Sequence, residues 1–201
     1  GASALMQGLS DGYFVIPYTL GGYFAATPLG KVTGGEPAFA ESERLCAEKI
    51  RRLMSVKGHR TAGDFHRELG NLLWEHVGMA RNKAGLEKAL AKIPEIREAF
   101  WRDVTVAGAA GDFNQCLEQA GRVADYLEFA ELLARDALHR AESCGGHFRE
   151  ESQTAEGEAQ RDDAHFCYVG ALEYRGDGAA PELSKEPLSF ENIALATRSY
   201  K

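Results

Sequence analysis

The chain has 201 residues, of which 44% are hydrophobic and 26% are charged, a balance typical of a soluble globular protein of about one domain. This composition excludes a wholly disordered chain, a collagen-like repeat and a disulfide scaffold. The 30 acidic residues outnumber the 23 basic residues, and the net charge is −7. No general positive field is therefore available to bind nucleic acid or an anionic membrane surface.

Residues 1 to about 28 are apolar and rich in small residues. The stretch 12–30 carries no charge and approaches the roughly 20 residues of a membrane span. However, Pro17, Pro28 and the pair Gly21-Gly22 would break the helix that a bilayer requires, so we expect burial against protein instead. The chain starts without Met, as if inside an element, and we expect it to be a fragment.

If the fragment lacks its covering domain, the apolar start is left exposed. Leu5, Leu9, Tyr13 and Phe14 would then form a patch that favours association. We expect self-association of the fragment or a disordered N-terminus. The glycine-rich link at residues 30–37 marks a domain boundary. We therefore predict three parts: residues 1–35, residues 36–146 and residues 147–201.

Apolar residues recur at three- and four-residue steps between residues 38 and 143, which predicts four helices. The first ends at Gly58, and Thr61 with Asp64 resembles a capping box that starts the second. Pro94 should kink or divide the third, at a cost of about 3 kcal/mol. The fourth runs from about residue 113 to residue 143, with Gly145-Gly146 as its stop signal. The stripes comprise Cys46, Ile50, Leu53 and Met54, then Phe65, Leu69, Leu72, Leu73 and Val77, then Leu86, Leu90, Ile93, Phe100 and Val104, and finally Leu117, Ala120, Ala124, Leu127 and Ala134.

These helices predict a mainly α fold, an up-and-down three-helix bundle similar to a spectrin repeat, with a shorter first helix. Met54, Trp74 and Trp101 are interpreted as core or near-core residues rather than cofactor contacts. Residues 150–163 read as a surface loop. Residues 165–174 and 188–195 read as strands of a small β appendage, separated by turn residues.

Reactive side chains concentrate in residues 142–150, Glu-Ser-Cys-Gly-Gly-His-Phe-Arg-Glu. Cys144 and His147 could form a nucleophile with its base. Alternatively, His147 and Arg149 could tie the tail onto carbonyls and carboxylates at the end of the preceding helix. The four cysteines at 46, 116, 144 and 167 have no zinc-ligand spacing, and no His/Cys cluster occurs. We therefore expect free thiols and no metal within this chain.

The same run, Glu-Ser-x-Gly-x-His-x-Arg-Glu, resembles the motif after the long helix in flavoprotein subunits of succinate dehydrogenase and fumarate reductase. Further segments are similar to that family over essentially the whole chain. They are residues 74–82 with Gly85-Leu86, Arg161-Asp162-Asp163, Lys185-Glu186-Pro187-Leu188 and Arg198-Ser199-Tyr200.

The resemblance implies an FAD enzyme that interconverts succinate and fumarate and passes electrons to an iron–sulfur subunit. Residues 1–5 resemble the end of the family's Arg-Leu-Gly-x-x-Ser/Ala-Leu segment, which places Ala4 and Leu5 against the flavin. A helix N-terminus suits the anionic reduced flavin. The arginine of that segment would precede Gly1, and all catalytic residues are expected upstream, none in this chain.

The fragment itself is therefore expected to be noncatalytic and to bind no FAD tightly, serving a structural and subunit-contact role. Its implied partners are its own FAD-binding domain, the iron–sulfur subunit and, indirectly, a membrane cytochrome b subunit, with no nucleic acid. The implied location is cytoplasmic, on the inner face of the cell membrane. An L-aspartate oxidase C-terminal domain and a free-standing helical interaction module are the alternatives.

Overall fold

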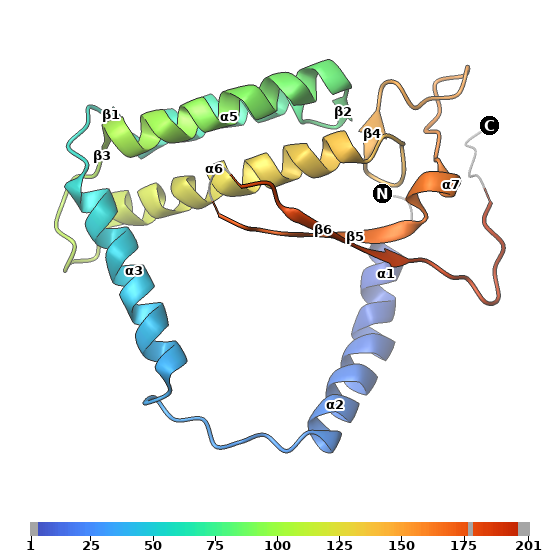
Figure 1. The fold of residues 1–201 in the computed structure, drawn as a ribbon, viewed down its shortest axis with the longest axis horizontal. Helices are drawn as coiled ribbons and strands as arrows, with labels where there is room; N and C mark the ends of the chain where they lie inside the picture. Colours follow the sequence, from blue (N-terminus) through green and yellow to red (C-terminus); the bar gives the residue numbers. More distant parts are fainter. Residues whose placement is uncertain (1–3, 177–178, 197–201) are drawn as a thin grey trace. The chain divides into compact units, whose positions relative to one another are not determined.

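The computed structural model describes residues 4–176 and 179–196, which fold mainly as helices with small two-stranded sheets (Figure 1). The chain forms two compact units, Gly1–Glu48 and Lys49–Lys201, and the division falls inside helix α3. This division differs from the predicted boundaries after residues 35 and 146. The three predicted parts stay a prediction.

The first unit contains a helical run made of α1 (Ala4–Ser10), the π-helical segment η1 (Asp11–Leu20) and α2 (Gly21–Ala26). The prediction that Pro17 and Gly21-Gly22 break a helix here is wrong. Pro17 lies within the π-helical segment, whose altered hydrogen bonding accommodates a residue without an N–H, and the Gly21 N–H bonds to the carbonyls of Pro17 and Tyr18.

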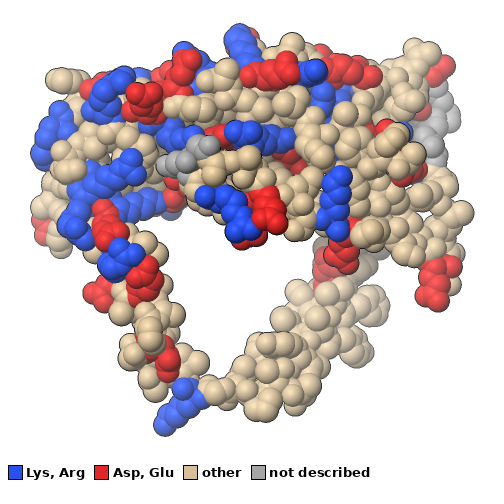
Figure 2. Space-filling view, in the orientation of Figure 1, with Lys and Arg blue, Asp and Glu red and all other residues tan. Residues whose placement is uncertain are grey.

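No residue of this run is buried, and Asp11 is its only charged residue. In the space-filling view, the helical run is almost entirely tan, the colour of uncharged residues (Figure 2). The part of the chain that the structure describes contains no helix both long and apolar enough to cross a membrane. Residues 27–36 are irregular and lead into α3 (Pro37–Ser55).

The second unit is built on three helices that pack against one another, α4 (Ala62–His76), α5 (Lys83–Asp103) and α6 (Gln115–His139). Each begins at a side chain that accepts a backbone N–H, namely Thr61, Asn82 and Asn114. At Thr61 the predicted capping box is confirmed, because Asp64 also accepts the Thr61 N–H at 2.9 Å.

Two short parallel ladders show that consecutive helices of this bundle are antiparallel. Strand β1 (Arg60–Thr61) precedes α4 and pairs with β3 (Val104–Thr105), which follows α5. Strand β2 (Ala80–Arg81) precedes α5 and pairs with β4 (Phe148–Arg149), which follows α6. The start of each helix therefore lies at the end of the next one, giving an up-and-down course.

The predicted stripes of α4, α5 and α6 largely form the core, but the stripe predicted for the first helix is wrong in part, because Leu53 is buried whereas Cys46 and Ile50 are exposed. Its fully buried large side chains include Leu53, Phe65, Leu69, Leu86, Ile93, Phe100 and Leu127. Helix α5 continues through Pro94, so the predicted division of this helix does not occur. The prediction that Trp74 is a core residue is wrong, since its side chain is 87% exposed. Trp101 is half-buried, with the Arg52 guanidinium 3.6 Å from its ring centroid.

The C-terminal part carries α7 (Asp163–Phe166) and an antiparallel hairpin of β5 (Tyr168–Glu173) and β6 (Glu182–Pro187). The predicted β appendage is therefore present. The predicted second strand at residues 188–195 is wrong, because these residues form no strand. The register pairs Leu172 with Leu183, so the partner of β5 is the more polar segment directly after the turn.

Candidate functional site

Helix α6 ends at His139, before the predicted stop at Gly145-Gly146. The intervening residues form a loop that turns back on the helix end. In this loop Cys144 and His147 pair through both backbone N–H groups, and Gly145 has φ +60°, which favours glycine. The loop therefore returns residues 147–149 to the last turn of α6.

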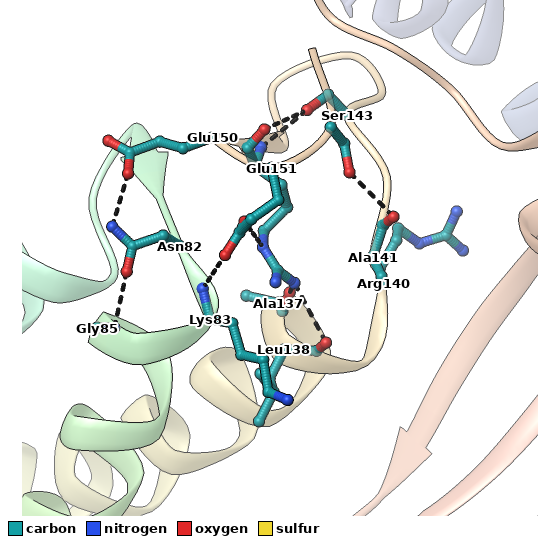
Figure 3. A network of polar contacts seen from close by, with 12 residues as sticks. Asn82, Lys83, Gly85, Ala137, Leu138, Arg140, Ala141, Ser143, Glu150 and Glu151 are labelled. Carbon is teal, nitrogen blue, oxygen red and sulfur yellow. Dashed lines mark hydrogen bonds and ion pairs between the residues drawn. The ribbon is translucent and has the colours of Figure 1, made fainter.

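There, side chains from the loop bind the terminal carbonyls of α6 (Figure 3). The buried Arg149 donates from Nη1 to the carbonyls of Ala137 at 2.9 Å and Leu138 at 3.2 Å. His147 Nε2 lies 2.7 Å from the carbonyl of Arg140. The helix-capping alternative for His147 and Arg149 is thus confirmed, because both satisfy carbonyls that the helix leaves unpaired.

Ser143 closes the base of the loop. Its side chain is fully buried; Oγ donates to the Arg149 carbonyl at 3.1 Å and accepts the Arg149 N–H at 2.8 Å. Ser152 donates to the carbonyl of Ala141 at 3.1 Å. These bonds fix the position of Arg149 relative to the helix that it caps.

The same loop also holds the start of α5 (Figure 3). Asn82 donates to Glu150 at 2.6 Å and accepts the N–H of Gly85 at 2.8 Å, while Glu151 accepts the N–H of Lys83. Glu151 also accepts from Arg149 Nε at 3.2 Å. The negative charge of Glu151 lies at a helix N-terminus, where the dipole favours it. We call the set Asn82, Ser143, His147, Arg149, Glu150 and Glu151 the helix-end clamp.

Cys144 and His147 are not arranged as a nucleophile with its base. His147 Nε2 is committed to the Arg140 carbonyl, and burial lowers the pKa of His147, which disfavours the charged ring. Partial burial and the charge of Glu142 raise the pKa of the Cys144 thiol. A reactive cysteine requires the opposite shift, so the nucleophile hypothesis is not supported.

A second set of contacts joins the end of α6 to the C-terminal hairpin, which the sequence reasoning missed. Arg140 pairs with the buried Glu142 at 2.7 Å and donates to the carbonyls of Phe166 and Tyr168. Glu142 also accepts the N–H of Asp162 at 2.8 Å. The sequence signal for these contacts was the position of Arg140, at a helix end and two residues before Glu142, the first residue of the quoted motif.

The predicted flavin contacts, Ala4 and Leu5, lie in the first turn of α1, and Leu5 is 92% exposed. Their role stays a prediction. The four cysteines are free thiols. Within residues 4–176 and 179–196, no group of three or more His, Cys, Asp or Glu could hold a metal ion.

The fold and the clamp together define a helical bundle domain whose tail is fastened to its helix ends. The family described as "Fumarate reductase flavoprotein C-term" matches residues 66–200. The chain belongs to this family.

The relatives agree with this assignment. The fumarate reductase flavoprotein subunit of Proteus vulgaris is 29% identical over 153 residues, 76% of this chain and 25% of its own length. The Escherichia coli subunit of the same name is 26% identical over 167 residues, 83% of this chain and 27% of its own. An L-aspartate oxidase from Synechocystis is 24% identical over 127 residues, 56% of this chain and 23% of its own.

Solved structures show the same fold. E. coli quinol fumarate reductase superposes with a TM-score of 0.67 at 23% identity, covering 82% of this chain and 27% of that one. The Mycobacterium smegmatis Sdh1 complex gives a TM-score of 0.62, also at 23% identity, covering 83% of this chain and 26% of that one. The chain thus spans about a quarter of the length of the relatives that it matches.

Proposed function

We propose that this chain is the C-terminal helical part of a succinate dehydrogenase or fumarate reductase flavoprotein subunit, and that its role is structural. The observation that carries this proposal is the helix-end clamp. It commits Arg149 Nε and Nη1 and His147 Nε2 to partners within the chain, at helix ends, and not to a substrate. Part of the proposal is that residues 1–35 are the end of an FAD-binding domain, followed by a spectrin-like bundle at 36–146 and a tail at 147–201.

The described residues could form only one side of an FAD-binding site. Ala4 and Leu5 offer backbone groups and apolar contact, and the run from Ala4 to Ala26 has no basic side chain to hold the pyrophosphate. When bound in the intact subunit, FAD would accept a hydride from succinate. The role of Ala4 and Leu5 would be to lie against the flavin ring, and the catalytic groups would come from the part of the polypeptide that precedes this chain.

In the intact complex the chain would stabilise the FAD-binding domain and contribute to the contact with an iron–sulfur subunit. The complex would lie on the inner face of the cell membrane. A membrane cytochrome b subunit would attach it there, so that the contact of this chain with that subunit is indirect. The names of the relatives support this proposal, because they are fumarate reductase and succinate dehydrogenase flavoprotein subunits.

The decisive experiment compares this chain with the protein made from the full native reading frame. We expect the long protein to show flavin absorbance and succinate-dependent dye reduction, and this chain to show neither. Stoichiometric FAD or succinate oxidation in the 201 residues alone would refute the noncatalytic role. Oxidation of L-aspartate instead of succinate by the long protein would favour the L-aspartate oxidase alternative, which the match to the Synechocystis enzyme keeps open.

A further inference from the structure

Helix α6 carries a second apolar stripe on the side that it does not bury in the core. Its buried side is lined mostly by alanines, together with Val123 and Leu127. On its exposed side, Tyr126, Phe129 and Leu133 follow at steps of three and four residues and are 42%, 66% and 40% exposed. Such steps place the three side chains on one face of a helix. A surface helix normally presents polar residues to solvent, so this face lacks a cover within the described residues.

A groove of about 160 Å³ lies along this stripe, between α6 and α4, and α4 lines it with His66, Leu69, Gly70 and Leu73. A Cβ on Gly70 would meet no atom within 4 Å outside its own helix, so the packing of this chain does not require glycine there. Glycine destabilises a helix interior relative to alanine, but it lets another backbone approach closely. Because α4 and α6 both run antiparallel to α5, a further helix antiparallel to the pair fits the groove.

Opposite charges stand at the two ends of the stripe. Arg122 lies seven residues before Phe129 and Asp136 seven residues after it, and both are exposed. The Asp136 carboxylate makes no ion pair among the residues that the structure describes. Arg122 Nε pairs with Glu118, but a guanidinium has five N–H donors and can bind a second carboxylate. Along the stripe, the steps from Arg122 to Asp136 are four, three, four and three residues, which is the spacing of a coiled-coil seam.

The stripe is self-complementary, because it reads nearly the same from either end with the charges exchanged. If a second copy of α6 lay antiparallel, Phe129 would meet the same residue of that copy, and Tyr126 would lie beside its Leu133. Arg122 would then face Asp136 of the second copy, and this pair would form twice in the dimer. A parallel pair of helices would instead bring like charges together at both ends.

We propose that this face of α6, with the groove beside it, is an interface between two copies of this chain. In the dimer, α6 of the second copy lies antiparallel to α6, and its backbone approaches Gly70. The charge complementarity of Arg122 and Asp136 selects a second copy as the partner, since one helix supplies both members of the pair. The inference concerns a face of the bundle and does not depend on the proposed function.

The oligomeric state of the whole chain is the first test. Association through the apolar helical run is removed by replacing Tyr13, Phe14 and Ile16 with Ser, and sedimentation equilibrium then measures the remaining dimer. We expect a monomer–dimer equilibrium, in which Phe129→Ser raises the dissociation constant about a hundredfold because it removes the central ring. The control Phe113→Ser removes an exposed ring outside this face and should leave the constant unchanged.

Charge reversal tests the pairing of the two ends. Asp136→Arg should raise the dissociation constant about tenfold, because Arg122 then faces a like charge twice in each dimer. Adding Arg122→Glu should return the constant to within about threefold of its starting value. Repulsion between Glu118 and a carboxylate at position 122 exists in monomer and dimer alike, so it cancels. The control Glu98→Arg makes the same change of charge on α5 and should have no effect.

A cross-link tests the direction of the second helix. In a chain carrying Arg122→Lys, a carbodiimide should join the amine at position 122 to the Asp136 carboxylate of the second copy, as identified by mass spectrometry. Within one helix these positions are 14 residues apart, about 21 Å at 1.5 Å per residue, which a zero-length reagent cannot span. The link therefore has to join two copies.

The outcomes decide the proposal without reference to flavin. A chain with the three Ser replacements that stays monomeric at high concentration would overturn the dimer and leave this face to another part of the polypeptide. A dimer that tolerates Asp136→Arg, that Arg122→Glu does not rescue, or that lacks the link between positions 122 and 136 would overturn the antiparallel seam. Circular dichroism of each variant shows that the bundle remains folded. Flavin binding and succinate oxidation by the long protein test the proposed function separately.

Discussion

The bundle helices α4, α5 and α6 each bury one side in a common core, whereas the helical run α1–η1–α2 buries no residue within its own unit. The bundle helices interrupt their apolar residues with charged ones at regular steps, so each has one face to hide and one to expose. The helical run has apolar residues on all sides and only Asp11 as a charge. Apolar content alone therefore does not build a core, because a helix needs a periodic pattern to direct burial.

The largest expected effect is that of removing an aromatic ring from the core of the bundle. Phe100 is fully buried and packs edge-to-face on Phe65, with ring centroids 5.3 Å apart. Phe100→Ala should lower the free energy of unfolding by about 3–5 kcal/mol, measured by urea unfolding. The control Phe113→Ala removes a ring that is 94% exposed and should change it by less than about 0.5 kcal/mol. Similar losses in the two variants would contradict the described core.

Removing the arginine of the helix-end clamp should have the next largest effect. Arg149→Met would leave the carbonyls of Ala137 and Leu138 without this donor and Glu151 without its buried cation. We expect a loss of about 3 kcal/mol and faster amide hydrogen exchange in the last turn of α6. The control Arg102→Met alters an arginine whose side chain is 71% exposed, and should leave both quantities nearly unchanged. A stable Arg149→Met variant would show that the clamp is dispensable.

Glu131 joins α5 to α6 through a buried carboxylate, which accepts from Arg97 at 2.7 Å and from Arg135 at 2.6 Å. Glu131→Gln should lower the free energy of unfolding by about 2–3 kcal/mol at pH 7. Glu98→Gln, at an exposed position with a weak ion pair, serves as the control and should change stability little.

The same variant has a defined pH dependence. Burial by itself raises the pKa of Glu131, but the hydrogen bonds from Arg135 and Arg97 outweigh it, and the pKa in the folded protein is lowered. The stabilisation is therefore complete above the unfolded value of about 4.3 and is lost as pH falls through the folded value. The difference between wild type and Glu131→Gln should shrink on acidification. A difference that grows below pH 5 would contradict this assignment.

A smaller effect is expected at the start of α4. Thr61→Ala removes one half of the capping box with Asp64 and should lower the free energy of unfolding by about 1 kcal/mol. Thr33→Ala, in the irregular link, should have no measurable effect on the same unfolding transition. If both variants unfold alike, the capping box does not contribute to stability.

The smallest effect on stability should come from the helical run. Replacing Tyr13, Phe14 and Ile16 with Ser leaves the bundle's unfolding within about 0.5 kcal/mol of wild type, because these side chains are exposed. The same changes should reduce self-association of the chain, measured by light scattering at high concentration, since they remove an exposed apolar patch. A wild-type chain that stays monomeric at high concentration would contradict the association that we expect.

Local patterns in the sequence determined much of this protein. The stripes through Phe65, Leu86 and Leu127 predicted the helices and their buried faces, and Thr61 with Asp64 predicted a helix start. These predictions succeed because helical periodicity and capping depend on residues three or four apart. The quoted motif at 142–150 also gave the helix-capping roles of His147 and Arg149, as one of two alternatives, and the family.

The tertiary structure decided what depends on contacts distant in sequence. The sequence predicted caps from His147 and Arg149 but placed the end of this helix near residue 143, whereas α6 ends at His139 and both side chains bind carbonyls there. Trp74 lies outside the core although it comes directly after Leu73 of the predicted stripe. Packing against the other helices decides which residues beside a stripe are covered. The strand partner of β5 was likewise set by hairpin register, not by apolar content. The opposition of Arg81 and Arg149 likewise arises only from the pairing of β2 with β4.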